Sequence, residues 1–410
     1  MDLTVVIGAG AAGIAAARRL RDAGAQVLLV DASDRLGGRA HTAILGGYPV
    51  DLGCGWLHSA RRNPWTQIAE AGGLTIDRAS PKWDEQWHDL GFPPAEQEAS
   101  GEAWEHWNKA AHAALHGPDR PLSDFIGADD PWRPMIDAIS GYANGANLDR
   151  VSLHDWAAYE DAAGDENWAV REGYGTLIAG HAAGVSVRLR TAVTRIDHRG
   201  RTLRLETSAG TIEAARAIVA VPTTVLASGA LRFDPPLPDK QAAADALPLG
   251  LADKAILAVA GPLPWPAHSH LIGDPHARET ASYRLSPFGW PIIEAFFGGA
   301  CAEALEGGDA AAFAIDELVA LLGADWRARL TPLGVTRWRQ EPWIGGSYSH
   351  ARIGQAGQRQ VLAEPVQGRL FFAGEACHRH DFSTAHGAWE TGVAAAEAVL
   401  ASVARPEASR

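Results

Sequence analysis

The sequence has few of the residues that build metal centres or disulfide frameworks. Its 410 residues include only three cysteines, Cys54, Cys301 and Cys377, which form no Cys-x-x-Cys pair and leave an odd thiol. Neither a zinc site nor a disulfide-rich secreted fold is therefore expected, and we predict that the protein binds no metal. We expect these cysteines to be reduced thiols, as in the cytoplasm.

Long apolar runs and basic runs are missing as well. No stretch reaches the ~18 uninterrupted apolar residues of a membrane span, and the apolar run from Leu3 leads directly into a glycine motif, leaving no room for a signal peptide. The balance of 36 basic against 49 acidic residues gives a net charge of −13. We therefore expect a cytoplasmic protein that binds neither membranes nor nucleic acid.

A glycine-rich turn near the start of the chain is typical of dinucleotide binding. Gly8, Gly10 and Gly13 stand between an apolar strand and a helical run of small residues, and the next strand ends at Asp31. Gly8 permits a tight turn, Gly10 lets the backbone approach a pyrophosphate at the helix N-terminus, and Gly13 lets helix and strand pack closely. The Asp31 carboxylate can accept hydrogen bonds from ribose hydroxyls.

The alternation of strands and helices breaks off and returns. Trp83–His116 is rich in tryptophan, acid and alanine, and Pro118–Pro134 is broken by prolines, which indicates a second structural unit. The regular pattern predicts strands and helices at 3–7, 11–23, 26–30, 173–183, 185–190, 193–198, 203–207, 217–221, 369–373 and 387–401. Phe233–Pro238 is predicted to be a rigid extended connector.

Several separated motifs together resemble the flavin amine-oxidase family. They are the Gly8–Gly13 turn, Arg35-Leu36-Gly37-Gly38-Arg39, Arg171–Gly175, Phe233–Pro238, Pro248–Lys254 and Phe372-Ala373-Gly374-Glu375. The resemblance implies an α/β fold, α+β overall, in which a Rossmann-type FAD/NAD(P)-binding domain of the p-hydroxybenzoate-hydroxylase type is interrupted by a discontinuous substrate-binding domain. We place the FAD-binding domain at 1–78, 172–243 and 332–410 and the substrate-binding domain at 79–171 and 244–331.

The same resemblance implies which residues hold FAD. In it, Val193 meets the adenine end through its backbone, Glu375 hydrogen-bonds the ribityl or phosphate part, and the helix beginning near Thr384 aims its amides at the pyrimidine edge of the flavin. Attachment is expected to be non-covalent, because Ser347 stands where some relatives carry the linking cysteine. The complete predicted set is Gly8, Gly10, Ala12, Gly13, Asp31, Ala32, Arg35, Gly38, Arg39, Gly53, Gly55, Trp56, Val193, Trp338, Trp343, Gly374, Glu375, Thr384 and Ala385.

Four residues are predicted to act in catalysis. Lys254 matches the lysine that holds a water beside flavin N5 in the family; without that match it would be an ordinary lysine at a strand edge. Tyr348 matches one wall of an aromatic cage, and the partner position holds Thr384, which suggests a wider pocket. His58, in a Trp-Leu-His ending most like that of polyamine oxidases, either deprotonates an amine or makes a structural hydrogen bond.

Acids and tryptophans of the predicted substrate-binding domain allow two interpretations. Asp84, Glu85, Glu160 and Asp161 either hold distal ammonium groups of a polyamine or are solvated surface carboxylates. The tryptophans either line an aromatic tunnel or pack in the core. Those in question are Trp83, Trp87, Trp104, Trp107, Trp132, Trp156 and Trp168.

The sequence therefore predicts an FAD-dependent amine oxidase. A hydride passes from the α-carbon of the amine to flavin N5, water hydrolyses the imine, and O2 becomes H2O2. The expected partners are a small-molecule amine, a polyamine or a primary or secondary amine, and O2. Two alternatives are a carotenoid-type desaturase or isomerase and a flavin-binding regulatory protein with little turnover. Monomer and homodimer are both open.

Overall fold

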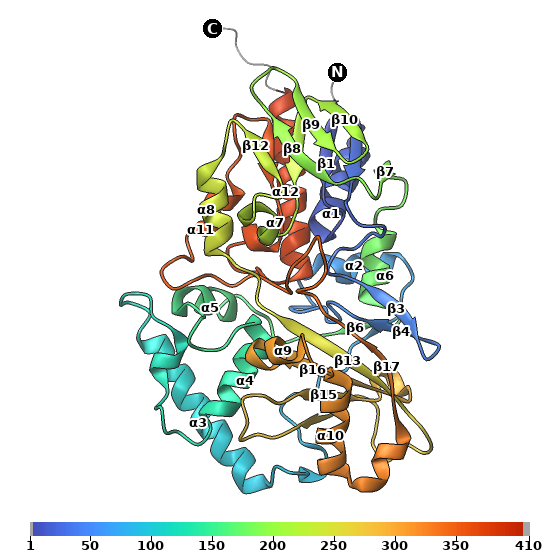
Figure 1. Cartoon of the computed structure of the whole chain (residues 1–410), viewed down its shortest axis with the longest axis vertical. Coiled ribbons are helices and arrows are strands. Elements are labelled where there is room, and N and C mark those ends of the chain that lie inside the picture. Colours follow the sequence, from blue (N-terminus) through green and yellow to red (C-terminus); the bar gives the residue numbers. More distant parts are fainter. Residues whose placement is uncertain (1–2, 405–410) are drawn as a thin grey trace.

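The computed structural model describes residues 3–404 and shows two regions, each built on its own five-stranded sheet (Figure 1). We call them the parallel-sheet region and the antiparallel-sheet region after these sheets. Both views place them at opposite ends of the molecule, with the first and last segments of the chain together in the parallel-sheet region. The predicted mixture of helix and sheet is confirmed.

The parallel sheet has the strand order β18-β11-β1-β2-β7. Its strands are β1 (Thr4–Ile7), β2 (Val27–Val30), β7 (Val187–Arg188), β11 (Arg216–Val219) and β18 (Leu370–Phe372). Their short apolar runs are typical of strands covered on both faces. On β1, Val6 packs in the core with one pair of helices, whereas Val5 and Ile7 pack in the core on the opposite face.

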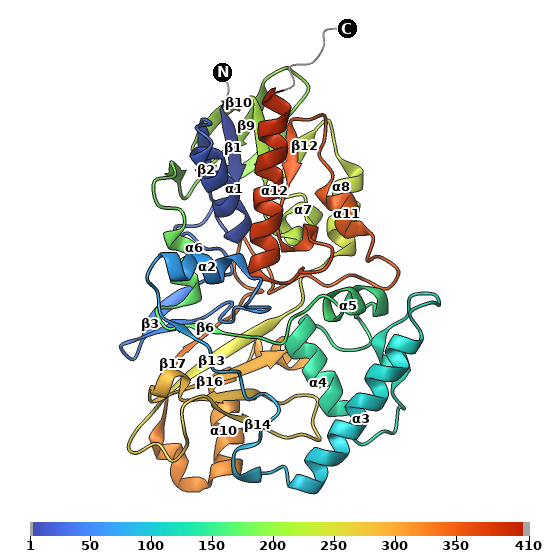
Figure 2. The same ribbon diagram turned by 180° about the vertical axis from the view of Figure 1, so that it is seen from behind.

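Two helices cover the Val6 face, α1 (Ala11–Asp22) and α12 (Ala385–Ala404), which lie side by side in Figure 2. They pack so closely that a Cβ on Gly392 would lie 2.1 Å from the carbonyl oxygen of Ala12. The opposite face is covered by a four-stranded sheet and by three short helices. These elements are β8 (Val193–Asp197), β9 (Leu203–Thr207), β10 (Gly210–Ala214), β12 (Arg232–Asp234), α7 (Thr223–Ala227), α8 (Pro238–Ala246) and α11 (Gln358–Ala363).

The antiparallel sheet has the order β14-β15-β16-β13-β17. Its strands are β13 (Ala252–Val259), β14 (Ser269–Ile272), β15 (Ser282–Leu285), β16 (Ile292–Gly298) and β17 (Leu330–Val335). Side chains alternate between the two faces of a strand. Leu257, Tyr283 and Ile293 pack with Leu318 in the core beneath α10 (Ala310–Leu322). The residues that alternate with them along the strands therefore lie on the opposite face of the sheet.

The remaining elements surround and connect the two sheets. Two small ladders join β3 (Thr42–Leu45) to β4 (Tyr48–Asp51) and β5 (Ile76–Asp77) to β6 (Ala169–Val170). The other helices are α2 (Pro64–Ala71), α3 (Pro94–Ala113), α4 (Arg133–Asn144), α5 (Leu153–Glu160), α6 (Tyr174–Gly180) and α9 (Gly299–Leu305). Short 3-10 turns are η1 (Trp87–Asp89), η2 (Leu122–Phe125), η3 (Pro287–Gly289), η4 (Ala324–Arg329) and η5 (Glu375–Cys377).

The predicted elements of the parallel-sheet region are present, with ends that differ by a few residues. The extended connector at 233–238 is partly regular, because its first residues belong to β12 and Pro238 begins α8. The predicted domain boundary at 331/332 falls within β17, which pairs with β13. Among residues 3–404, no helix combines the length and the apolar character needed to cross a membrane.

Candidate active site

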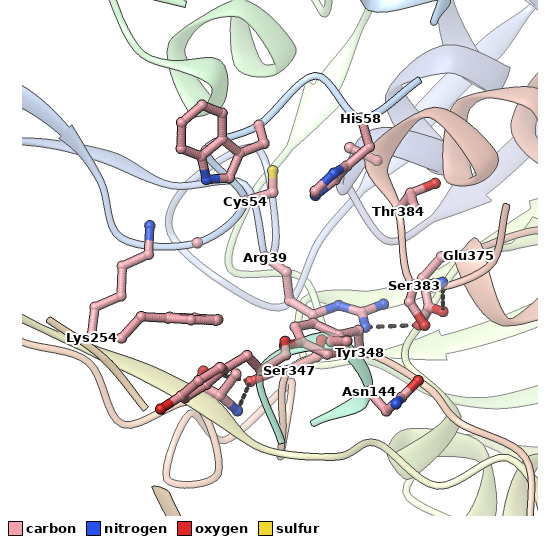
Figure 3. A pocket seen from close by; sticks show the side chains of 18 of the residues that line it. Arg39, Cys54, His58, Asn144, Lys254, Ser347, Tyr348, Glu375, Ser383 and Thr384 are labelled. Carbon is pink, nitrogen blue, oxygen red and sulfur yellow. Dashed lines mark hydrogen bonds and ion pairs between the residues drawn. The ribbon is translucent and has the colours of Figure 1, made fainter. Parts of the chain in front are cut away.

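A cavity of about 1050 Å³ is lined by residues of both sheet regions. Most of the residues predicted to bind FAD or to act in catalysis line it, and Figure 3 shows side chains from distant segments converging there. Gly13, Ala32 and Val193 are outside the lining. The predicted residues that line it are Gly8, Gly10, Ala12, Asp31, Arg35, Gly38, Arg39, Gly53, Gly55, Trp56, His58, Lys254, Trp338, Trp343, Tyr348, Gly374, Glu375, Thr384 and Ala385.

The three glycines of the first turn meet different surroundings. A Cβ on Gly13 would lie 1.8 Å from the carbonyl oxygen of Gly8, so only glycine allows α1 to pack against β1 there. A Cβ on Gly10 would meet nothing nearer than the Gly37 carbonyl oxygen, 4.0 Å away. Gly10 is the N-cap of α1 and provides no side-chain cap, so the first amides of the helix are available to an anion in this space.

The Asp31 carboxylate is fixed at the edge of the cavity. One oxygen accepts a hydrogen bond from the Ala9 amide at 2.5 Å, and the other accepts from the amide and hydroxyl of Ser33 at 2.7 and 2.6 Å. The Gly37 amide donates to the Ala9 carbonyl at 2.8 Å, which ties the second glycine segment to the first, and Arg35 donates to the Gly38 carbonyl at 2.7 Å within the second segment. Open space at a helix N-terminus with an acid beside it fits the phosphates and ribose of a dinucleotide.

Arg39 and Glu375 form an ion pair at the cavity wall, with 2.8 Å between Arg39 Nη1 and Glu375 Oε1 (Figure 3). Arg39 also donates to the Ser347 carbonyl, and Glu375 Oε2 accepts from Ser349 Oγ at 2.6 Å and from the Ser383 amide at 2.9 Å. Burial acts to raise the pKa of Glu375, but the Arg39 charge and these hydrogen bonds outweigh it and hold the pKa below its usual value. The carboxylate therefore stays ionised.

Lys254 reaches the cavity from β13. Its Nζ donates to the Asp51 carbonyl at 2.6 Å, and its amide donates to Thr336 Oγ1 at 2.7 Å. The Asp51 carboxylate in turn accepts from the amides of Tyr174 and Gly175 at the start of α6, at 2.9 and 3.1 Å. The end of β4 thus joins the lysine to a helix N-terminus, which leaves the ammonium group few positions to adopt.

His58 lies at the cavity with its ring orientation fixed. Nδ1 is 2.6 Å from Asn167 Oδ1, and the Asn167 amide nitrogen donates to the Asp165 carbonyl at 3.1 Å. Because the Asn167 oxygen accepts, Nδ1 carries the proton and Nε2 is left as an acceptor. Burial lowers the pKa of His58 to about 4, so the ring is neutral at neutral pH.

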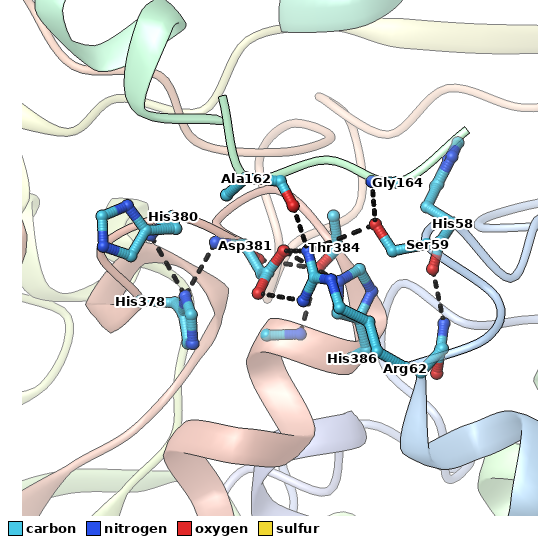
Figure 4. Close-up of polar contacts among 12 residues, drawn as sticks. His58, Ser59, Arg62, Ala162, Gly164, His378, His380, Asp381, Thr384 and His386 are labelled. Atoms are coloured by element: carbon cyan, nitrogen blue, oxygen red, sulfur yellow. Dashed lines mark hydrogen bonds and ion pairs between the residues drawn. The ribbon is translucent and has the colours of Figure 1, made fainter. Parts of the chain in front are cut away.

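A network of polar contacts holds the segment that carries His58 (Figure 4). Arg62 donates to both oxygens of Asp381, at 2.8 and 2.5 Å, and to the Ala162 carbonyl at 2.8 Å. The Thr384 hydroxyl donates to the Asp381 carbonyl at 2.6 Å and accepts from the Gly387 amide at 3.0 Å. The hydroxyl of Thr384 is therefore engaged at the start of α12, and what this residue offers the cavity is mainly its small size.

Tyr348 and Ser347 line the cavity from the segment between η4 and α11. The Tyr348 hydroxyl donates to the Tyr142 carbonyl, which anchors the ring to the end of α4. Ser347 is buried, and its hydroxyl accepts from the Ala252 amide and donates to the Ala252 carbonyl, both at 2.7 Å. Cys377 is buried in the core of the parallel-sheet region.

The tryptophans divide between the cavity and the core. Trp83, Trp104 and Trp132 line the cavity, whereas Trp107 and Trp156 are buried in a core cluster beneath α3. The acids divide as well. Asp84, Glu85, Glu160 and a further residue, Asp165, line the cavity and are exposed, so they mark its mouth, while Asp161 stands outside the lining and faces His112.

The antiparallel sheet adds cavity residues that the sequence analysis missed. They alternate with core residues on β14, β15 and β16, so the cavity forms against the face of the sheet opposite α10. A signal was present, because single polar residues interrupt apolar strands at every second position. The missed residues are His270, Ile272, Ser282, Arg284, Glu294 and Phe296.

Comparison with known proteins identifies the family. The model of the flavin-containing amine oxidoreductases matches residues 11–156 and 123–400. Polyamine oxidase 2 of Arabidopsis thaliana is 31% identical over 96% of this chain and 87% of its own length. The chain belongs to the flavin-containing amine oxidoreductase family.

Other relatives extend this result. Polyamine oxidase 3 of Oryza sativa subsp. japonica is also 31% identical, over 96% of this chain and 88% of its own length. Lysine-specific histone demethylase 2 of Homo sapiens is 27% identical over 97% of this chain and 53% of its own length. As a member of the family the protein is an oxidoreductase that acts on amine groups with FAD as its cofactor, which confirms the predicted cofactor and enzyme class. The match favours amine oxidation over carotenoid-type desaturation.

Proposed function

We propose that this protein oxidises a small amine that is cationic in water, a polyamine or a primary or secondary amine, with O2 as the electron acceptor. One observation carries the proposal. The part of the cavity lined by residues of the predicted substrate-binding domain, 79–171 and 244–331, which we call the substrate part, has more acidic than basic side chains. Its acids are Asp84, Glu85, Glu160, Asp165 and Glu294, and its bases are Lys254 and Arg284. Such a cavity attracts cations. Two relatives described as polyamine oxidases agree with it.

The residues of the parallel-sheet region fit FAD. In the proposal, the amides at Gly10 and the start of α1 bind the pyrophosphate, Asp31 binds the ribose, and Arg39 and Glu375 hold the middle of the cofactor. Bound FAD supplies the hydride acceptor for the amine α-carbon and passes the two electrons to O2, giving H2O2. The domain division and the p-hydroxybenzoate-hydroxylase type of arrangement belong to the same proposal.

The chain's own residues prepare the amine. His58 Nε2 accepts the proton of the bound ammonium and passes it to water, because an amine transfers hydride from its neutral form and a ring with a pKa of about 4 does not keep a proton at neutral pH. Lys254, fixed on the Asp51 carbonyl, holds a water, and Tyr348 forms one wall for the amine nitrogen. Thr384 leaves room on the other side. Water then hydrolyses the imine to an aldehyde or ketone.

The test is anaerobic mixing of the yellow holoenzyme with spermidine, putrescine, aromatic monoamines and amino acids while the flavin absorbance is followed. We expect amines of one class to bleach the flavin, and O2 consumption with H2O2 formation on exposure to air. Bleaching without peroxide would identify a different electron acceptor. If nothing bleaches the flavin, the protein is a flavin-binding regulator or acts on another substrate, and the proposed function is wrong.

Non-covalent attachment has its own test. Ser347 cannot form a thioether, and its hydroxyl is already bonded to the Ala252 backbone. Acid precipitation should therefore release all the flavin into the supernatant. Yellow colour that stays in the pellet would show a covalent link at another residue.

A further inference from the structure

One row across the antiparallel sheet places charged and polar side chains on the cavity floor. His270 on β14 stands opposite Arg284 on β15, and Arg284 stands opposite Glu294 on β16. All three line the cavity, and the side chains of Arg284 and Glu294 are only 14% and 13% exposed. Charged groups that are largely buried usually have a partner of opposite charge or a hydrogen-bond partner. The contacts of these residues therefore indicate which kind of ligand they can bind.

The Arg284 guanidinium contacts His268 and two aromatic rings, those of Trp56 and Phe288. Its Nε and Nη2 are 3.3 and 2.9 Å from His268 Nδ1, and its plane lies over the Trp56 ring at 4.3 Å. His268 Nε2 lies 2.8 Å from Asp77 Oδ2. Burial and the neighbouring Arg284 charge lower the pKa of His268, which favours the neutral imidazole. Nδ1 faces the arginine, whereas Nε2 faces both the Asp77 carboxylate and the Phe288 amide, which is 3.2 Å away. Arg284 is therefore held in place, with Nε and Nη2 directed at His268 and Nη1 directed at Glu294.

The Glu294 carboxylate, in contrast, has no hydrogen-bond partner among the described residues. The Nη1 of Arg284 is 3.7 Å from its Oε2, which is an ion-pair distance and too long for a hydrogen bond. Within residues 3–404 no donor makes a hydrogen bond to this carboxylate. A buried acceptor that lacks donors is costly unless a ligand or water supplies them. A protonated amine supplies both the N–H donors and the positive charge that this carboxylate lacks at hydrogen-bonding distance.

We propose that Glu294, positioned by Arg284, binds a second protonated nitrogen of the substrate. It thereby selects diamines and polyamines over monoamines of equal length. Lys254 and Glu294 are on the same face of the sheet, because Lys254 pairs with Phe296, two residues along β16 from Glu294. Diagonal neighbours of this kind lie about 7–8 Å apart, with their Cβ atoms somewhat closer. A short alkyl chain therefore spans from the region of Lys254 to Glu294. This inference rests on the proposed oxidation of cationic amines.

The experiment compares putrescine, butylamine and aminobutanol, which share a carbon chain and differ at the far end. Affinities are measured on the wild-type holoenzyme and on Glu294→Gln, by anaerobic flavin reduction and by calorimetry on dithionite-reduced enzyme, in which no amine reacts. We expect putrescine to bind wild type at least tenfold more tightly than the other two. Glu294→Gln should weaken putrescine about tenfold to a hundredfold, the usual range for losing a charge-assisted hydrogen bond, and change butylamine less than twofold.

Glu102→Gln is the matched control, because it removes the same charge from an exposed position on α3 outside the cavity. It should leave all three affinities unchanged. Equal weakening of putrescine and butylamine in Glu294→Gln, or no preference for putrescine in wild type, would overturn the inference. The wild-type comparison decides the question even if Glu294→Gln does not fold. Reduction by all three amines without preference would leave the proposed oxidase intact, whereas no reduction by any amine would remove the proposed function itself.

Discussion

The two sheet regions contribute to the cavity in different ways. At the turn before α1 the parallel-sheet region offers backbone: glycines and the free amides of that helix. The antiparallel-sheet region offers side chains, among them Lys254, Arg284 and Glu294, on one face of a sheet whose other face is core. A backbone site tolerates few residue types at a few positions, whereas a side-chain site can be rebuilt by single substitutions. We therefore propose that the first region determines which cofactor binds and that the second determines which substrate binds.

The largest expected effect is at Gly13. A Cβ there overlaps the Gly8 carbonyl, and neither β1 nor α1 can move without disturbing the core on both sides of the sheet. Gly13→Ala should lower the free energy of unfolding of the apoprotein by about 3 kcal/mol or more, the upper range for overpacking. Urea unfolding of the apoprotein measures this. Gly10→Ala is the control, because its Cβ meets only space: it should unfold like wild type and yet bind FAD far more weakly.

This pair also shows why the sequence predicted one region better than the other. The roles of Gly8, Gly10 and Gly13 follow from backbone geometry, which a motif of fixed spacing records. The resemblance to a family supplied Lys254 and Tyr348, which also stand in recognisable segments. All of these except Gly13 line the cavity.

Arg284 and Glu294 could not be assigned in the same way. Each is a single charged residue in an apolar strand, and their meeting depends on the register of β15 against β16, which pairing across the sheet decides. His58 was left between two interpretations for a similar reason. Its partner Asn167 is 109 residues away in sequence, so the hydrogen bond that fixes its tautomer appears only in the folded chain.

The next effect concerns Lys254 in the antiparallel-sheet region. Lys254→Met keeps an unbranched side chain that is one atom shorter but removes the group that donates to Asp51 and is proposed to hold a water. We expect flavin reduction or reoxidation to slow at least a hundredfold, within the range for losing a catalytic proton donor or acceptor, with FAD still bound. Stopped-flow absorbance separates the two half-reactions. Turnover at the wild-type rate would contradict the role of Lys254.

A smaller effect is expected from pH, through a histidine of the cavity floor. Burial lowers the pKa of His270 to about 4. Between pH 6.5 and 4 this histidine is therefore protonated in the unfolded chain and neutral in the folded chain. Stability should therefore fall as the pH drops through this window, by about 3 kcal/mol for this residue. His270→Gln, which keeps a donor and an acceptor, should remove that share of the pH dependence of urea unfolding. His106→Gln, at an exposed position, is the control and should not.

The smallest expected effect is at Glu160, which lies at the mouth of the cavity, whereas Glu294 lies on the sheet that forms its floor. Glu160 is exposed there, so water and salt screen its attraction for a bound cation. Glu160→Gln should weaken putrescine binding about twofold to threefold at low ionic strength and hardly at all at high salt, because the Debye length is then only a few ångströms. The loss in Glu294→Gln should persist at high salt, since that carboxylate is nearly buried. Calorimetry of both variants at two salt concentrations makes the comparison. Equal salt dependence would mean that solvent screens Glu294 as strongly as Glu160. The preference for diamines would then come from the total negative charge of the cavity and not from the position of Glu294.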